Sequence, residues 1–100
     1  MRNIILFCNQ GMSTSLLVKK MEEAAKAMAY DCQIYAYPMV EAEQVGKAAD
    51  MILLGPQVRF KQKEIAGKCP GVPVEVIDIS AYGTMNGEKV INDVKTKLGD

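Results

Sequence analysis

The feature that most constrains this sequence is a cysteine in a polar turn between an apolar run and a helix-like segment. Residues 4–7, Ile-Ile-Leu-Phe, are apolar on both faces, as strands of a covered parallel sheet are. From Leu16 onward, apolar residues recur at helical spacing. The turn between the two segments consists of Cys8, Asn9, Gln10, Gly11, Met12, Ser13, Thr14 and Ser15. A thiol is therefore predicted where a strand ends and a helix begins.

This turn is suited to holding an anion beside the sulfur. The first amides of a helix have no intrahelical partner, and together with the helix dipole they attract negative charge. The same field favours thiolate over thiol, so we expect a lowered pKa and a nucleophilic sulfur at Cys8. Ser13 or Thr14 is the predicted N-cap. A thiolate in a phosphate-sized loop, residues 9–15, indicates a phosphoryl group carried on sulfur, although a cysteine at a strand end is often only a small core residue.

The rest of the chain alternates between strand-like and helix-like segments. Strands are predicted at residues 32–37, 49–54 and 74–77, and helices at residues 13–29, 41–47, 57–67 and 90–98. The strand at 32–37 is less apolar than the others, so we expect it at an edge of the sheet. Val58, Phe60 and Ile65 are expected to face inward. The alternation predicts an α/β fold, with a parallel sheet and helices on both of its faces.

In such a sheet the functional crevice lies at the carboxyl ends of the strands. Besides Cys8, the residues expected there are Gln57, Asp78 and Tyr82. Gln57 either donates an amide hydrogen bond to a phosphoryl oxygen or is only the exposed start of a helix. Asp78 is expected to cap the turn after it, and Tyr82 to be half-buried under the loop. Arg59 is expected to be a solvated helix residue, with phosphate binding as the alternative.

Composition excludes several classes of protein. One hundred residues, 49% of them apolar, are enough for one domain with its own core. The net charge of zero gives no basic face for nucleic acid. No histidine is present, so Cys-His and Ser-His-Asp catalysis and phosphohistidine are excluded. A receiver domain would need an acidic cluster where Cys8 and Asn9 stand.

The cysteines and the hydropathy exclude further classes. Three cysteines without a Cys-x-x-Cys pair predict neither a zinc site nor a redox pair, and Cys32 and Cys69 are interpreted as small hydrophobic residues. We expect no metal and no cofactor. No apolar run is long enough to cross a bilayer and no signal peptide is evident, so a cytoplasmic protein is expected. A non-catalytic binding module stays open if Cys8 is inert.

The residues at the turn resemble a known family. Residues 8–18 are similar to the start of the IIB proteins of the lactose/cellobiose (chitobiose) class of the bacterial sugar phosphotransferase system. Residues 53–57 and 74–78, with Tyr82-Gly83 after them, resemble the same family in the same order. The Gly-Met-Ser-Thr-Ser run at residues 11–15 is closer to the cellobiose branch, whereas Asn9 and Gln10 are larger than the residues associated with that branch.

The resemblance has consequences for fold and function. It implies a single IIB domain over residues 1–100, with a four-stranded parallel sheet in the order 2-1-3-4 inside a three-layer αβα arrangement like flavodoxin and the low-molecular-weight phosphatases. It implies that Cys8 accepts a phosphoryl group from a phosphohistidine of a IIA protein. Cys8 then passes the group to a sugar, for example a β-linked disaccharide such as cellobiose or chitobiose, during uptake by the membrane permease IIC. The protein would then be cytoplasmic and would associate peripherally with IIC.

The alternative activity is that of a low-molecular-weight protein tyrosine phosphatase. Its motif is a cysteine, five residues, an arginine and then Ser or Thr, and the arginine position is Thr14 in this chain. Without a guanidinium that grips two phosphoryl oxygens, hydrolysis loses a transition-state donor, which typically costs ~100-fold or more in rate. A loop of amides and hydroxyls therefore favours a carrier over a phosphatase.

Overall fold

The computed structural model describes the backbone of residues 1–8 and 11–100 and the side chains of residues 1–8 and 14–100. Its four strands are β1 (Arg2–Cys8), β2 (Cys32–Pro38), β3 (Met51–Leu54) and β4 (Val74–Val76). All neighbouring pairs are parallel and the order is β2-β1-β3-β4, so the predicted fold class and strand order are confirmed and β2 lies at an edge. The register pairs Cys8 with Pro38 and Phe7 with Leu54, which brings the carboxyl ends of the strands together.

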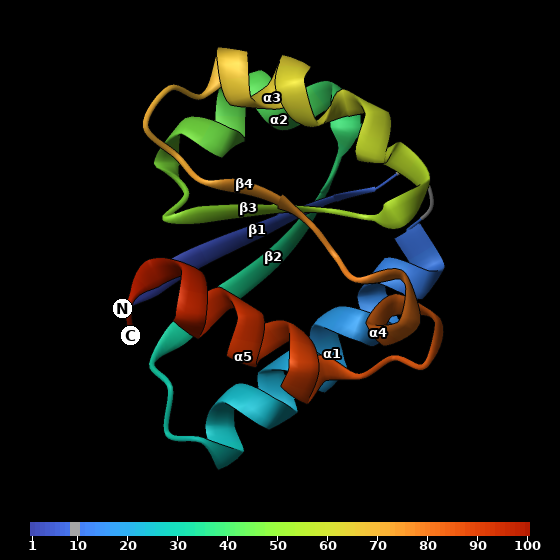
Figure 1. The fold of residues 1–100 in the computed structure, drawn as a ribbon, viewed down its shortest axis with the longest axis vertical. Helices are drawn as coiled ribbons and strands as arrows, with labels where there is room; N and C mark the ends of the chain where they lie inside the picture. Colours follow the sequence, from blue (N-terminus) through green and yellow to red (C-terminus); the bar gives the residue numbers. More distant parts are fainter. Residues whose placement is uncertain (9–10) are drawn as a thin grey trace.

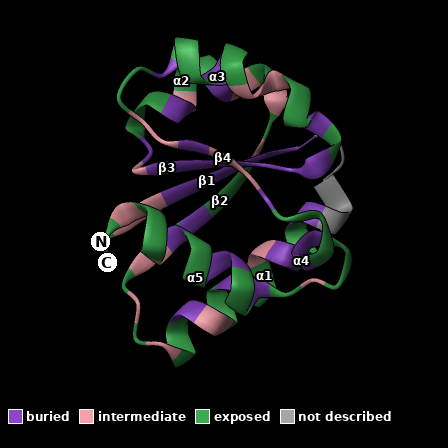
Figure 2. Cartoon of the chain, in the orientation of Figure 1, coloured by how far each residue is buried: buried purple, intermediate pink, exposed green. Residues whose placement is uncertain are grey.

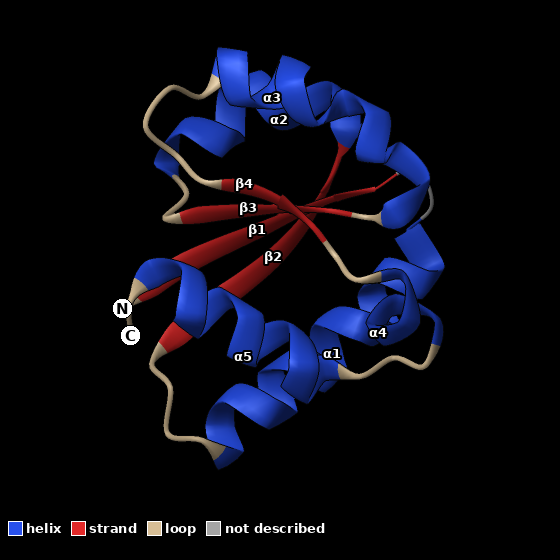
Figure 3. Cartoon of the chain, in the orientation of Figure 1, coloured by secondary structure: helices blue, strands red, loops and turns tan. Residues whose placement is uncertain are grey.

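Helices cover both faces of the sheet, as predicted (Figure 1 and Figure 3). The longer helices are α1 (Gly11–Ala27) and α5 (Gly87–Leu98), which lie on one face with the short α4 (Ile79–Gly83). The other face carries α2 (Ala42–Val45) and α3 (Gln62–Lys68). Short 3-10 helices precede or follow these elements: η1 (Met39–Glu41), η2 (Gly46–Ala48) and η3 (Pro56–Lys61).

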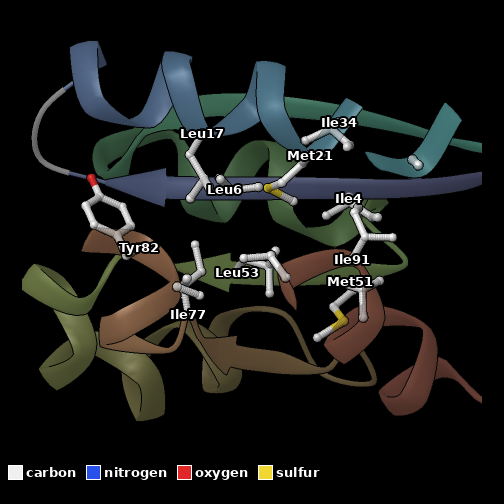
Figure 4. Close-up of a cluster of buried hydrophobic side chains, with 14 residues drawn as sticks. Ile4, Leu6, Leu17, Met21, Ile34, Met51, Leu53, Ile77, Tyr82 and Ile91 are labelled. Atoms are coloured by element: carbon white, nitrogen blue, oxygen red, sulfur yellow. The ribbon is translucent and has the colours of Figure 1, made fainter. Parts of the chain in front are cut away.

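The central strand β1 divides its side chains between two cores. Successive residues of a strand point to opposite faces, so Ile4 and Leu6 pack under α1 and α5, whereas Ile5 and Phe7 pack under α2 and α3. Residues 4–8 are all buried (Figure 2). The first of these cores also contains Tyr82 (Figure 4). The sheet is covered on both sides, and its chemistry is therefore restricted to its ends and edges.

Three local predictions need correction. Helix α1 begins at Gly11 and not at Ser13 or Thr14, so neither of these residues is the N-cap. Phe60 is 74% exposed and not inward-facing, because residues 56–61 form a 3-10 helix with a kink at Val58 (φ −118°, ψ 22°), to which α-helical spacing does not apply. The helix expected at 41–47 is split into η1, α2 and η2, whose N-caps make no side-chain hydrogen bond.

Other local predictions are confirmed. Asp78 caps α4 by accepting a hydrogen bond from the Ala81 amide at 2.9 Å. Helix α5 buries Val90 and Val94 and ends at Gly99, whose φ of 77° is the left-handed conformation that glycine adopts without strain. No helix in the described ranges combines the length and the apolar character that crossing a membrane requires.

Candidate functional site

The Cys8 sulfur lies at the carboxyl end of the sheet, where a central strand gives way to a long helix. Cys8 is the last residue of β1 and is 8% exposed. Helix α1 starts at Gly11 and runs for 17 residues, so its positive amino end lies close along the chain to the sulfur. The first turn of α1 ends at the buried Thr14, and the exposed Ser15 follows it. This is the strand–thiol–helix arrangement that the sequence predicts.

Tyr82 brings a hydroxyl group to the sulfur from the other end of the chain. Its Oη lies 3.6 Å from Cys8 Sγ, and the residue is only 8% exposed. Figure 4 shows the hydroxyl at the tip of β1, while the ring belongs to the core on the face that α1 and α5 cover. The Tyr82 amide also donates to the Asp78 carbonyl at 2.9 Å, so the Asp78 cap fixes the turn that carries the ring. Tyr82 is more buried than predicted, and its contact with the sulfur is not evident in the sequence.

Gln57 contacts the sulfur from the segment after β3. Its Oε1 lies 3.9 Å from Cys8 Sγ, within range for a thiol that donates to an amide oxygen. The residue is exposed, so its side chain reaches the sulfur from the protein surface. Gln57 lies at the exposed start of η3, as one interpretation predicts, and its amide oxygen faces the sulfur as an acceptor. Donation from the amide to a phosphoryl oxygen stays a prediction.

Gly55 provides the space in which these groups meet. A Cβ atom at Gly55 would lie 2.8 Å from Gln57 Oε1 and 3.1 Å from Cys8 Sγ. The φ of Gly55 is −60°, so its backbone does not require glycine and the reason for the residue is close approach. The sequence indicates only a turn at this position. The signal for the further role is that a glycine directly follows a strand paired with β1.

Arg59 and Asp78 make their hydrogen bonds away from the sulfur. The Arg59 Nη1 donates to the Pro56 carbonyl at 3.0 Å, so this exposed guanidinium is bound to its own segment, as the simpler interpretation predicts. Asp78 is exposed and acts through its cap. Asn9 and Gln10 lie outside the described residues, and for Gly11, Met12 and Ser13 only the backbone is described.

The remaining cysteines lie in different environments. Cys69 is fully buried, and its thiol donates to the Ala42 carbonyl at 3.7 Å. Burial raises the pKa of Cys69, and it is also the main cause of the raised pKa of Cys32, with Asp31 and Glu22 adding to it. These thiols stay protonated near neutral pH, which agrees with their interpretation as small hydrophobic residues. Among the described residues, no group of three or more metal-ligating side chains is present.

Comparison with known proteins identifies the family. The family profile described as "PTS system, Lactose/Cellobiose specific IIB subunit" matches residues 3–93. The oligo-beta-mannoside-specific EIIB component of Bacillus subtilis (strain 168) is 41% identical over 91 residues, covering 89% of this chain and 88% of that protein. Two EIIB components of Lactococcus lactis are each 42% identical over 95 residues, covering 88% of both chains. One is galactose-specific (subsp. cremoris, strain MG1363) and the other cellobiose-specific (subsp. lactis, strain IL1403).

Solved structures agree with these matches. The solution structure of the cellobiose-specific phosphotransferase IIB component from Borrelia burgdorferi superposes with a TM-score of 0.73 at 42% identity, covering 91% of this chain and 85% of that one. The lactose-specific IIB domain from Streptococcus pneumoniae has a TM-score of 0.79 at 17% identity, with 93% of each chain covered, and supports the fold. The match favours the carrier over the phosphatase. The chain belongs to the lactose/cellobiose-specific IIB subunits of the phosphotransferase system, phosphoryl-carrying enzyme components that work with IIA and IIC proteins.

Proposed function

We propose that Cys8 is the residue that carries the phosphoryl group. It takes the group from the phosphohistidine of a IIA protein and passes it to a sugar bound by the permease IIC, with residues 1–100 acting as one IIB domain. The observation that carries this assignment is the position of its sulfur at the end of β1, next to the amino end of α1 and in contact with the Gln57 amide and the Tyr82 hydroxyl. A thiolate is the nucleophilic form of cysteine, and a helix amino end stabilises it.

The other nucleophiles of the chain support this assignment by contrast. Histidine is absent from the sequence. Cys69 has no exposed surface, so a phosphohistidine cannot reach it. The raised pKa of Cys32 keeps that sulfur protonated. Cys8 is 8% exposed, and its sulfur is in contact with groups that can hold charge.

The chemistry consists of two in-line transfers. In the first, the thiolate forms an S–P bond while the N–P bond of the donor breaks and its electron pair returns to the imidazole. The backbone amides of residues 9–15 are proposed to hold the phosphoryl oxygens, with the Gln57 amide beside them. The Arg59 guanidinium donates to the Pro56 carbonyl, so among the described residues it does not supply the bidentate donor that accelerates hydrolysis. The phosphocysteine would therefore persist until an acceptor arrives.

The segments that follow the strands expose apolar side chains of the kind that docking faces present. Each strand is followed by a segment with a large exposed apolar side chain: Leu16 (47% exposed), Val40 (90%), Phe60 (74%) and Ile79 (65%). We define these four residues as the apolar rim. The donor protein IIA and then the permease IIC must each reach the sulfur. Both are therefore proposed to bind over the apolar rim. Tyr82 is too buried to form part of this surface.

The sugar is proposed to be a β-linked disaccharide, in line with the resemblance to the cellobiose branch. The names of the relatives include cellobiose, galactose and oligo-beta-mannoside, so the class covers several sugars. Uptake assays with the cognate permease and each of these sugars would identify the acceptor. Peripheral association with IIC on the cytoplasmic side follows from this role.

The proposed site is tested by intact-mass measurement after incubation with phosphoenolpyruvate and the upstream relay including IIA. The wild-type protein should gain one phosphoryl group, Cys8→Ser should gain none, and Cys32→Ser should behave like the wild type. Labelling of Cys8→Ser at the wild-type level would contradict the assignment.

The docking face is tested separately. Replacing Phe60 of the apolar rim with Ser should slow transfer from IIA by about tenfold, because a buried aromatic residue at an interface often contributes more than 1 kcal/mol. Tyr35→Ser is the matched control, since Tyr35 is 42% exposed but lies within strand β2. Equal effects of the two changes would argue against docking over the rim.

A further inference from the structure

The buried hydroxyl of Tyr82 is the observation that goes furthest beyond carriage of the phosphoryl group on Cys8. Its Oη lies 3.6 Å from Sγ, and with 8% exposure the residue is more than nine-tenths buried. A hydrogen bond in such a site is not weakened by competing water, so it is worth more there than at the surface. The ring is held in the core and the Asp78 cap holds its helical turn, which keeps the hydroxyl close to the sulfur.

The direction of this hydrogen bond follows from the protonation state of the sulfur. A thiolate has no proton and can only accept, so Tyr82 must then be the donor. In the thiol form, the sulfur proton points to an acceptor, and Gln57 Oε1 lies 3.9 Å away. Tyr82 therefore stabilises the charged sulfur, whereas the Gln57 oxygen stabilises the protonated one.

We propose that Tyr82 is a catalytic residue whose hydroxyl stabilises Cys8 as a leaving group. The inference rests on the function proposed for Cys8. In the second transfer, the acceptor hydroxyl oxygen forms a bond to phosphorus and its proton goes to a base on the acceptor side. The S–P bond breaks and its electron pair stays on sulfur. The Tyr82 O–H donates to this developing negative charge and keeps its own proton throughout.

The two transfers depend on this hydrogen bond in different ways. In the phosphocysteine, the sulfur is bonded to phosphorus and is a poor acceptor, so the hydrogen bond is weak there and strengthens as the S–P bond breaks. The effect lowers the barrier for departure of the phosphoryl group. For arrival of the group, the same bond increases the amount of thiolate but makes each thiolate less reactive, so the two effects partly cancel. A residue with only a structural role would slow both transfers.

The first test is the pH dependence of alkylation of Cys8 by iodoacetamide, followed by peptide mass spectrometry. From the usual strength of a hydrogen bond to a charged group, Tyr82→Phe should raise the midpoint of the Cys8 profile by about one to two pH units. The ring is kept in this variant, so packing in the core is preserved. Tyr35→Phe, which removes the hydroxyl that donates to Gln33, should leave the midpoint unchanged. An unchanged midpoint in Tyr82→Phe would overturn the proposal.

The second test separates the two transfers. Transfer of the phosphoryl label from Tyr82→Phe to the sugar on IIC should be about tenfold slower than from the wild type. Loading of Cys8 from IIA, measured at a pH where the thiol is fully ionised, should change less than threefold. Equal slowing of both steps would show a structural role and overturn the proposal. Alkylation needs no phosphoryl donor, so the role of Tyr82 is tested separately from the function of Cys8. A wild-type protein that takes up no phosphoryl label refutes the function proposed for Cys8, whatever the alkylation midpoint.

Discussion

The two ends of the sheet use their side chains in opposite ways. At the amino end, Arg2 binds the Asp100 carboxylate through two hydrogen bonds of 2.9 and 2.8 Å, and the Tyr30 hydroxyl donates to the same carboxylate at 2.6 Å. Asp50 accepts from the Asn3 amide at 2.6 Å. At the carboxyl end lie the Cys8 sulfur and the apolar rim. One end is closed by pairing within the chain, and the other presents groups suited to contact with another molecule.

This difference indicates that the amino end contributes mainly to stability and the carboxyl end mainly to function. Asp100 is paired with Arg2, 98 positions away, and with Tyr30, 70 positions away, so β1 and the loop after α1 are both held to the end of the chain after α5. Function concentrates where loops leave a rigid scaffold, and here the scaffold is held at the far end. Changes at the carboxyl end should therefore leave stability intact, and changes at the amino end should leave phosphoryl transfer intact. Four predictions follow from this separation.

The largest effect is expected from a charge at the carboxyl end. Gln57→Glu places a carboxylate about 4 Å from the sulfur, where repulsion opposes both the thiolate and the phosphoryl group. Because Gln57 is exposed, solvent screens part of this repulsion, and we expect loading of Cys8 to fall on the order of tenfold to 100-fold. The initial rate of phosphorylation by IIA measures it. Gln33→Glu adds the same charge to an exposed position on β2, at the amino half of the strand, and should have no such effect.

A smaller effect is expected from filling the space at Gly55. In Gly55→Ala, the new Cβ would lie 2.8 Å from Gln57 Oε1, and the flexible amide would move away from the sulfur. Loading should fall by about tenfold, because the displaced Gln57 amide could no longer donate to an oxygen of the incoming phosphoryl group, and this is about the loss expected from one hydrogen bond to a charged group. Gly67→Ala is the control, because nothing lies within 4 Å of a Cβ at that position. A Gly55→Ala protein that loads at the wild-type rate would show that Gln57 has no part in the transfer.

The amino end should respond in stability and not in activity. Arg2→Met removes the guanidinium that pairs with Asp100, so the melting temperature should fall, by a small amount because the pair is at the surface. Asp100→Asn should have a similar effect, and the double variant should lose less than the sum of the two. Thermal unfolding followed by circular dichroism gives these values. A change in the rate of Cys8 phosphorylation would refute the separation of the two ends.

The smallest effect is a pH dependence of stability at the same end. The hydrogen bonds from Arg2 and from Tyr30 hold the pKa of Asp100 down at about 2, below its ordinary value of 3.8. A carboxyl with a pKa lower in the folded state stabilises the protein above the ordinary pKa and loses this contribution as the pH falls toward the folded value. Lowering the pH from 4 to about 2 should therefore reduce the free energy of unfolding of the wild type more than that of Asp100→Asn. Unfolding by denaturant at each pH measures this free energy. Parallel pH profiles would contradict this assignment.

The sequence was most informative where the determining interactions are local. Cys8 at a strand end, Asp78 as a cap and Gly99 as the end of α5 each depend on residues a few positions away, and all three predictions are confirmed. Periodicity failed at Phe60 because a 3-10 segment has a different repeat from an α-helix. The start of α1 was placed late because Ser13 and Thr14 are good N-caps, yet the helix already includes them.

What the sequence could not show are contacts that only the topology creates. Tyr82 lies 74 positions from Cys8 and Gln57 lies 49 positions away, and no local pattern reports that either side chain reaches the sulfur. The role of Gly55 depends on the neighbouring strand in the same way. The pairing of Arg2 with Asp100 requires that α5 return to the start of β1. The family resemblance predicted the fold, which is confirmed, and it predicts Cys8 as the nucleophile, while the structure added the groups around that sulfur.

The ion pair between Arg2 and Asp100 also determines how this protein can be attached to something else. It holds residues 1 and 100 near each other, at the end of the sheet away from the sulfur (Figure 1). A tether, an affinity tag or a fused partner joined at either residue would therefore leave from the same pole. Immobilising the protein through either terminus should leave the reactive pole facing the solution, where a docking protein can approach it.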